Sequence, residues 1–105
     1  MIPEVSPAQA AEWLASGEAM LLDVREVPEL GLAAVSGATH ISMSTLGARL
    51  FELDRGRKIA VMCHHGVRSY RVASYLQQQG FTDVHNVAGG IAAWADQVDA
   101  TVGRY

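Results

Sequence analysis

Cys63 is the one cysteine of the chain, and it stands where an apolar run, KIAVMC, gives way to the polar run HHGVRS. A thiol between a strand and the start of a helix faces backbone N–H groups and the positive end of a helix dipole, and both favour the thiolate. Arg68 and the neighbouring His64 and His65 supply further donors. Because the thiolate is the attacking form of cysteine, this pattern predicts a nucleophile at Cys63 and chemistry at sulfur.

Cys63 also fits two less reactive roles. A lone cysteine at a strand end is often a small buried hydrophobe, and only the polar loop that follows favours a nucleophile. Together with His40, His64, His65 and His85, it also suggests a metal site. Because no CxxC or HxxxH spacing completes a tetrahedral set of ligands, the sequence predicts neither a metal ion nor a bound cofactor.

Five short runs are predicted strands, residues 4–5, 20–24, 39–42, 58–63 and 84–87. The runs 20–24 and 58–63 are almost continuously apolar, as expected of strands that are covered on both faces. Asp23 lies near the end of the first of these two runs, and Cys63 ends the second.

Helical patterns fill the intervals between these runs. Ser6, with Pro7 and Gln9 after it, predicts a capped helix start, and Gly17 predicts the end of that helix. Leucines at 46, 50 and 53 predict a second helix, the residues from the HHGVRS loop to Gly80 a third, and the segment after Gly89 and Gly90 a fourth. Trp13 and Trp94 are predicted core residues.

The alternation of strand and helix predicts an α/β fold with three layers, in which a parallel sheet of about five short strands is flanked by helices. Reactive groups in such sheets gather at the carboxyl ends of the strands. Asp23 and Cys63 are both expected at that edge.

Composition limits the class of protein. The chain has 105 residues, of which 50% are hydrophobic and 18% charged, and this favours one domain over residues 1–105. A net charge of −3 without a run of Lys or Arg argues against nucleic acid as a partner. No apolar run approaches the roughly 18 residues of a membrane span, and a lone cysteine suits a reducing compartment, so a cytoplasmic protein without membrane contact is expected.

Three motifs carry a family resemblance. The run CHHGVRS, residues 63–69, resembles the CxxGxRS active-site loop of rhodanese-like sulfurtransferases. LLDVRE resembles the strand-and-turn motif near the start of that domain, and NVAGGIAAW resembles its closing GGxxAW motif. The motifs occur in the family's order and cover most of the chain, so the sequence is identified as similar to single-domain rhodanese-like proteins, with their three-layer sandwich fold.

The resemblance implies a sulfur-transfer cycle. Cys63 would take a sulfur atom from thiosulfate or a related donor, hold it as a persulfide, and pass it to a thiol, cyanide or a protein acceptor. The loop residues His64, His65, Gly66, Val67, Arg68 and Ser69 would surround the sulfur and bind the substrate. Their N–H groups would stabilise the anionic sulfur, and Gly66 would permit the tight turn.

Other roles in this loop are expected from residue type. The two histidines would draw anions to the mouth of the loop below about pH 6.5, where imidazole becomes charged. Ser69 is the expected cap of the following helix. Arg68 has two candidate roles, because its guanidinium can bind an anionic donor or brace the loop. Asp23 and Arg25 resemble the family pair that supports the loop, and they equally fit a purely structural ion pair.

Two alternative functions remain. Cysteine-dependent phosphatases place Arg six positions after the nucleophile, whereas here position 69 is Ser and Arg stands at 68. The cradle is one residue short, which favours a single sulfur atom over the tetrahedral substrate of a phosphatase or arsenate reductase. The second alternative is a non-enzymatic module that holds a persulfide and relays sulfur with a partner protein.

Overall fold

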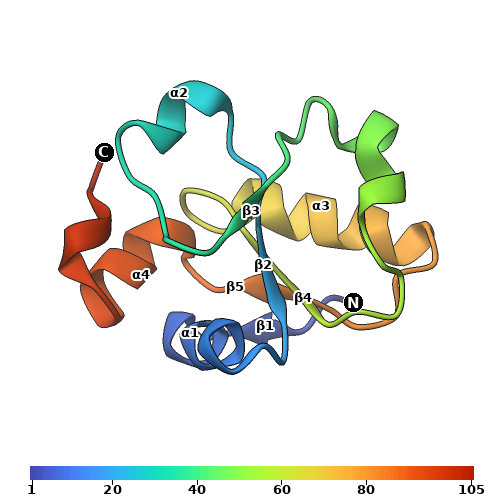
Figure 1. Cartoon of the computed structure of the whole chain (residues 1–105), viewed down its shortest axis with the longest axis horizontal. Helices are drawn as coiled ribbons and strands as arrows, with labels where there is room; N and C mark the ends of the chain where they lie inside the picture. The colour runs from blue at the N-terminus through green and yellow to red at the C-terminus, as the bar shows by residue number, and fades with distance from the viewer.

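Five parallel strands form the centre of the computed structural model, which describes residues 1–105 (Figure 1). They are β1 (Glu4–Val5), β2 (Met20–Asp23), β3 (Thr39–His40), β4 (Ile59–Met62) and β5 (Val84–Val87), in the spatial order β1-β5-β4-β2-β3. The predicted α/β fold with a parallel sheet is confirmed. β3 is shorter than expected, because only two of its predicted four residues pair with β2.

Four α-helices and two 3₁₀ helices surround the sheet: α1 (Pro7–Ser16), α2 (Val27–Leu30), η1 (Leu46–Glu52), α3 (Val67–Gln78), α4 (Gly90–Gln97) and η2 (Ala100–Val102). The short α2 and η2 were not predicted, and the leucine-spaced helix is a 3₁₀ helix. None of the helices combines the length and the apolar character that crossing a membrane requires.

The first helix begins as its sequence predicts, with one difference. Ser6 Oγ accepts a hydrogen bond from the backbone N–H of Gln9 at 3.1 Å. The Gln9 side chain donates to Glu12 and does not return to the cap, so only the serine part of the predicted capping pair is present.

Alternate residues of the strands build two cores, one on each face of the sheet. Leu22 and Val61 pack with α3 and η1 on one face, whereas Leu21 and Met62 pack with α1 and α4 on the other. Figure 1 shows these helix pairs on opposite sides of the sheet. This two-sided cover explains why β2 and β4 lack the alternation of polar and apolar residues that marks a half-exposed strand.

The two tryptophans occupy the second core unequally. Trp94 is buried, as predicted, whereas Trp13 is only partly buried and packs at the edge of that core. The ring of Trp13 lies beneath Lys58 Nζ, at 4.6 Å from the ring centre. Trp13 thus covers the core and meets a surface cation with the same ring.

The order in which the chain adds strands to the sheet reverses between β2 and β4, because β3 lies beyond β2 on one side and β5 lies beyond β4 on the other. In open parallel sheets the crevice at such a reversal, outside the carboxyl ends of the strands, is where ligands bind. Asp23 ends β2 beside its register partner Met62, and Cys63 follows directly. The fold therefore brings both predicted site positions to this edge.

Candidate active site

The sulfur of Cys63 lies within a short turn between β4 and α3. The residue is only 1% exposed. Sγ accepts hydrogen bonds from the backbone N–H groups of Gly66 and Ser69, at 3.1 and 3.3 Å. An acceptor of two amide hydrogen bonds in a buried place is suited to an anionic sulfur.

The pKa of the Cys63 thiol reflects two opposing influences. Burial is the largest single influence and raises the pKa, because it disfavours the charged thiolate. Hydrogen bonds from Ser69, Gly66 and His65 favour the thiolate, and together they outweigh burial. The pKa of Cys63 is therefore lowered from its ordinary value, which increases the fraction of attacking thiolate at neutral pH.

The backbone of this turn is fixed from the side of α4. The N–H of Ile91 donates to the carbonyl of Cys63 at 2.9 Å, and the N–H of Ala92 donates to the carbonyl of His64 at 3.1 Å. Gly90, in the GGIAAW motif, has a φ of +61°, and a Cβ there would collide with both carbonyl oxygens. The glycine is required because the start of α4 approaches the cysteine turn so closely.

Asn86, from β5, holds the turn on its buried side. Its Nδ2 donates to the carbonyl of Gly66 at 3.0 Å, and its Oδ1 accepts from the Ser69 hydroxyl at 2.5 Å. Glu4 accepts from the same Nδ2 at 2.5 Å. We call Asn86, Gly66 and Ser69 the inner clamp, since one amide side chain fixes the two residues whose N–H groups contact Sγ of Cys63.

Ser69 is not the cap of the following helix, contrary to the expectation from its type. α3 begins at Val67 after Gly66, whose φ is +96°, so Val67, Arg68 and Ser69 form the first helical turn rather than a loop. Ser69 is fully buried, and its hydroxyl is bonded to Asn86. The tight turn at Gly66 places the start of the helix three residues earlier than a cap at Ser69 would.

Arg68 pairs with Glu29 of α2. Its Nη1 and Nη2 donate to the two carboxylate oxygens at 2.8 and 2.7 Å. The Tyr105 hydroxyl donates to Glu29 Oε1 at 2.7 Å. We call Arg68, Glu29 and Tyr105 the outer clamp. Of the two roles expected for Arg68, this geometry supports bracing of the turn.

The electrostatics of the outer clamp follow from this pairing. The hydrogen bonds from Arg68 lower the pKa of Glu29 well below its usual value, although partial burial opposes the change. The same bonds raise the pKa of Arg68. Both groups are therefore charged at neutral pH and stabilise each other.

Asp23 and Arg25 form a buried ion pair. Arg25 Nη2 donates to Asp23 Oδ2 at 2.6 Å and to the carbonyl of Ala33 at 2.8 Å. Burial opposes the charge of Arg25, but its hydrogen bonds to Asp23 and Tyr105 leave its pKa raised. Arg25 Nη1 donates to the Tyr105 hydroxyl at 3.1 Å, so the pair reaches the cysteine turn through Tyr105 of the outer clamp.

His64 lies in a stack of three rings at the surface of the turn. Its ring centre is 3.8 Å from that of His65 and 3.8 Å from that of Tyr105. Burial, followed by the neighbouring His65, lowers the pKa of His64. His64 therefore becomes charged at a lower pH than the value of about 6.5 expected from its residue type.

The other two histidines point elsewhere. His40 Nε2 is 2.6 Å from the carbonyl of Arg25, and His85 Nε2 is 2.7 Å from Asp83 Oδ1. No three of the chain's His, Cys, Asp and Glu side chains gather as potential metal ligands.

Sequence reasoning missed Glu29, Asn86 and Tyr105. Asn86 carried a usable signal, because an amide in the short apolar run VHNV needs buried hydrogen-bond partners. Glu29 carried a weaker signal, since it follows a Val-Pro pair that starts α2. Tyr105 is far from the turn in sequence, and nothing in its neighbours predicts contact with His64.

Comparison with known proteins places this geometry in a family. The rhodanese-like domain model matches residues 6–97. A thiosulfate sulfurtransferase GlpE of Glaesserella parasuis is 36% identical over 91 residues, which are 87% of this chain and 84% of that protein. A sulfurtransferase of Allochromatium vinosum is 34% identical over 96 residues, which are 90% of each chain.

Solved structures agree with this assignment. A rhodanese-related protein from Thermoplasma volcanium superimposes with a TM-score of 0.82 at 31% identity, over 91% of this chain and 93% of its own. A human single-domain sulfurtransferase, TSTD1, superimposes with a TM-score of 0.80 at 25% identity, over 92% of this chain and 98% of its own. The family model spans most of the sequence, including the cysteine turn and the GGIAAW segment. The chain therefore belongs to the rhodanese-like domain family.

Proposed function

We propose that this chain is a sulfurtransferase that carries sulfur as a persulfide on Cys63. The observation that supports the proposal best is the pair of N–H groups, from Gly66 and Ser69, at hydrogen-bond distance from Sγ. These donors stabilise the thiolate before the reaction and the leaving thiolate at its end. The donor is thiosulfate or a related compound, and the acceptor is a thiol, cyanide or a protein.

The cycle has two displacement steps. In the first, the Cys63 thiolate attacks the outer sulfur of thiosulfate, a new S–S bond forms, and sulfite leaves with the electron pair of the broken bond. In the second, the acceptor attacks the outer sulfur of the persulfide, and Sγ leaves as a thiolate. The lowered pKa of Cys63 favours both steps, because it increases the attacking form and improves the leaving group.

Arg68 argues against phosphatase chemistry. A phosphate cradle needs an arginine whose guanidinium faces the nucleophile, whereas both Nη atoms of Arg68 are engaged with Glu29. The turn is also one residue shorter than the phosphatase spacing, since position 69 is Ser. A bound sulfur atom needs only the amide donors that the turn provides.

The proposal includes one domain over residues 1–105, working in the cytoplasm without a cofactor. The single domain is supported by the two sulfurtransferase relatives, which match this chain over 84% and 90% of their own lengths. Cell fractionation with a tagged full-length chain tests the location, and recovery in a membrane or secreted fraction would contradict it.

Intact mass spectrometry tests the chemistry. After thiosulfate treatment, the wild-type protein should gain one sulfur, about 32 Da, and lose it on addition of cyanide or a reductant. Cys63→Ser should gain nothing and should have no thiosulfate:cyanide turnover. Full turnover by the serine variant would contradict the proposal. A stable adduct with negligible turnover would indicate the relay module in place of the enzyme.

A further inference from the structure

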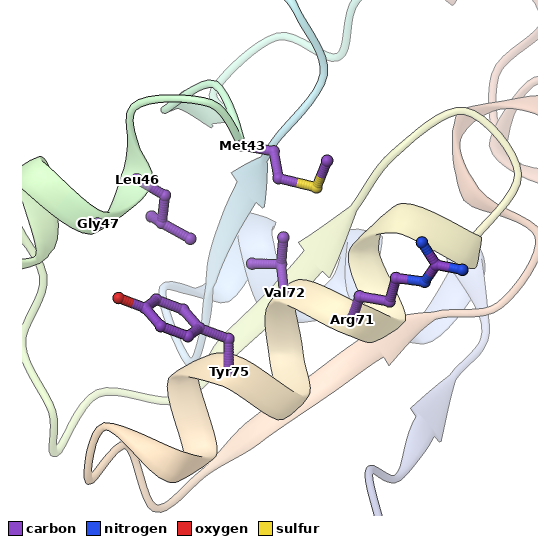
Figure 2. A pocket seen from close by; sticks show the side chains of 6 residues that line it. All are labelled: Met43, Leu46, Gly47, Arg71, Val72 and Tyr75. Atoms are coloured by element: carbon purple, nitrogen blue, oxygen red, sulfur yellow. The ribbon is translucent and has the colours of Figure 1, made fainter.

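An apolar groove of about 290 Å³ lies between η1 and α3. Four of its six lining residues are hydrophobic, and the full set is Met43, Leu46, Gly47, Arg71, Val72 and Tyr75. Figure 2 shows Leu46 and Tyr75 reaching into the space from the two elements, with Met43 above Val72. No step of the proposed cysteine chemistry uses this groove.

The groove is connected to the cysteine turn by one face of α3. Val67, Arg71 and Tyr75 are spaced four residues apart, so their side chains follow one another along the helix. The groove lies on the same face of the sheet as the cysteine, because Leu46 and Val72, which line the groove, pack in one core cluster with Cys63. Of the α3 residues that line the groove, Arg71 stands nearest to the cysteine turn, and Val72 and Tyr75 follow it along the helix.

Arg71 differs from every other cation of the chain. Of the eight Lys and Arg residues, seven make a hydrogen bond or an ion pair within the protein, namely Arg25, Arg49, Arg55, Arg57, Lys58, Arg68 and Arg104. Arg71 makes none. Figure 2 shows its guanidinium directed toward the first turn of α3 and away from Leu46. A free guanidinium beside an apolar groove complements a carboxylate attached to an apolar chain.

We propose that this groove is the binding site for an organic acceptor thiol that has a carboxylate beside its sulfur and an apolar chain beyond it. The inference rests on the proposed sulfurtransferase function. The apolar chain of the ligand lies between Leu46 and Tyr75, and its carboxylate pairs with Arg71. The thiolate of the ligand attacks the outer sulfur of the Cys63 persulfide. The new bond joins the sulfur of the thiol to the outer sulfur of the persulfide, so the ligand leaves as a persulfide, and the electron pair of the broken S–S bond returns to Sγ.

Three thiols separate the two recognition elements. 2-Mercaptooctanoate has both the apolar chain and the carboxylate. 2-Mercaptopropionate lacks the long apolar chain, and 2-mercaptooctanamide lacks the negative charge. Each buried methylene favours binding by roughly fourfold, so burial of two or three should give the long acid a kcat/KM about 15 to 60 times that of the short acid. The carboxylate should favour the acid over the amide by about fivefold, the upper range for a partly exposed ion pair.

Two variants remove these preferences one at a time. In Gly47→Phe the ring fills the groove, and the backbone accepts it because a Cβ at this position meets only Tyr75 Oη, at 3.5 Å. The preference for the long chain should fall to near one, while the preference for the acid over the amide remains. In Arg71→Gln the preference for the acid over the amide should fall to near one, while the preference for the long chain remains. Arg49→Gln, which removes a cation paired with Glu52 elsewhere on η1, is the control and should keep both preferences.

A binding measurement on a variant that cannot transfer sulfur completes the test. In Cys63→Ser, 2-hydroxyoctanoate should shift the NMR signals of Leu46 and Tyr75, and Gly47→Phe added to that variant should abolish the shifts. Absence of these shifts, or a chain-length preference that survives Gly47→Phe, would overturn the groove as the binding site. Failure of the sulfurtransferase function would instead appear as no transfer to cyanide or to any thiol, whatever 2-hydroxyoctanoate does in the binding experiment.

Discussion

The inner and outer clamps hold the same turn by different physical means. The inner clamp is buried and bonded through neutral groups, since Asn86 and Ser69 are at most 1% exposed. In the outer clamp, the side chains of Arg68 and Glu29 are 32% and 19% exposed, and they interact as an ion pair. Water competes with the outer contacts, whereas the inner contacts have no substitute if they are lost.

Because of this difference, loss of a contact should have different consequences in the inner clamp and in the outer clamp. Loss of an inner contact leaves buried polar groups unsatisfied and displaces the N–H groups that face Sγ. Loss of an outer contact frees side chains that water can solvate, and the donors to Cys63 stay in place. The inner clamp should therefore control the reactivity of the thiol, and the outer clamp should control mainly the stability of the surface around it.

Asn86→Ala should have the largest effect. It leaves the Ser69 hydroxyl and the Gly66 carbonyl without their buried partner, at a cost of about 1–3 kcal/mol of unfolding free energy. Displacement of the two donors should lower kcat/KM for thiosulfate by up to about a hundredfold. It should also raise the pKa of Cys63, so that the acid limb of the pH profile of kcat/KM moves to higher pH.

Ser69→Ala is the matched control for this prediction. It removes the hydroxyl bonded to Asn86 but retains the backbone N–H that contacts Sγ and the Asn86 bond to Gly66. Its effect on kcat/KM should be smaller than that of Asn86→Ala, but the acid limb of its pH profile should also move to higher pH, because the Ser69 side chain is the largest of the contributors that lower the pKa of Cys63. If Asn86→Ala destabilised the protein but left the pH profile unmoved, its role would be structural only.

Glu29→Gln should have a smaller effect that depends on pH and salt. The variant keeps the size of the side chain and removes its charge, so the unfolding free energy should fall by about 1 kcal/mol or less at neutral pH. The pKa of Glu29 is lower in the folded protein than its ordinary value of 4.5. The ion pair therefore stabilises the wild type above about pH 4.5, and this contribution declines as the pH falls further and the folded-state carboxylate is protonated.

Urea unfolding of wild type and Glu29→Gln at pH 7 and pH 3 measures this contribution. The difference between the two proteins should narrow at pH 3, and it should also narrow at pH 7 in about 1 M salt, where the Debye length is about 3 Å. If the difference in unfolding free energy between the two proteins were the same under all three conditions, Glu29 would stabilise the fold through packing and not through its charge. The kcat/KM for thiosulfate should change little, in contrast to Asn86→Ala.

The two clamps also differ in how far the sequence predicts them. The alternation of strands and helices along the chain, the end of β4 just before Cys63 and the tight turn at Gly66 follow from apolar runs and glycine positions, which are local signals. Asp23 and Arg25 are two residues apart, so their pairing was also predictable as an ion pair. These features depend on neighbours in the sequence.

Contacts between residues that are far apart in the sequence could not be predicted from such local signals. Arg68 and Glu29 are 39 residues apart, and Arg25 and Tyr105 are 80 residues apart. Their contacts depend on how α2 and the C-terminal segment lie over the sheet, and α2 itself has only four residues, none of them buried. Asn86 is the exception, since a buried amide in a short strand requires partners even before the partners are known.

Tyr105→Phe should have the smallest effect and should separate the two contacts that Tyr105 makes. The variant removes the hydroxyl that bonds to Glu29 and Arg25 but keeps the ring stacked on His64. The cost should be about 0.5 kcal/mol, the lower end for a hydrogen bond, because Tyr105 is exposed and water can replace the lost hydroxyl. The pKa of His64, followed by NMR, should therefore stay low. In Tyr105→Ala the ring is lost, burial of His64 decreases, and its pKa should rise toward the ordinary value. Equal pKa values of His64 in the two variants would show that the stack does not keep the imidazole neutral, and that the outer clamp acts through Glu29 alone.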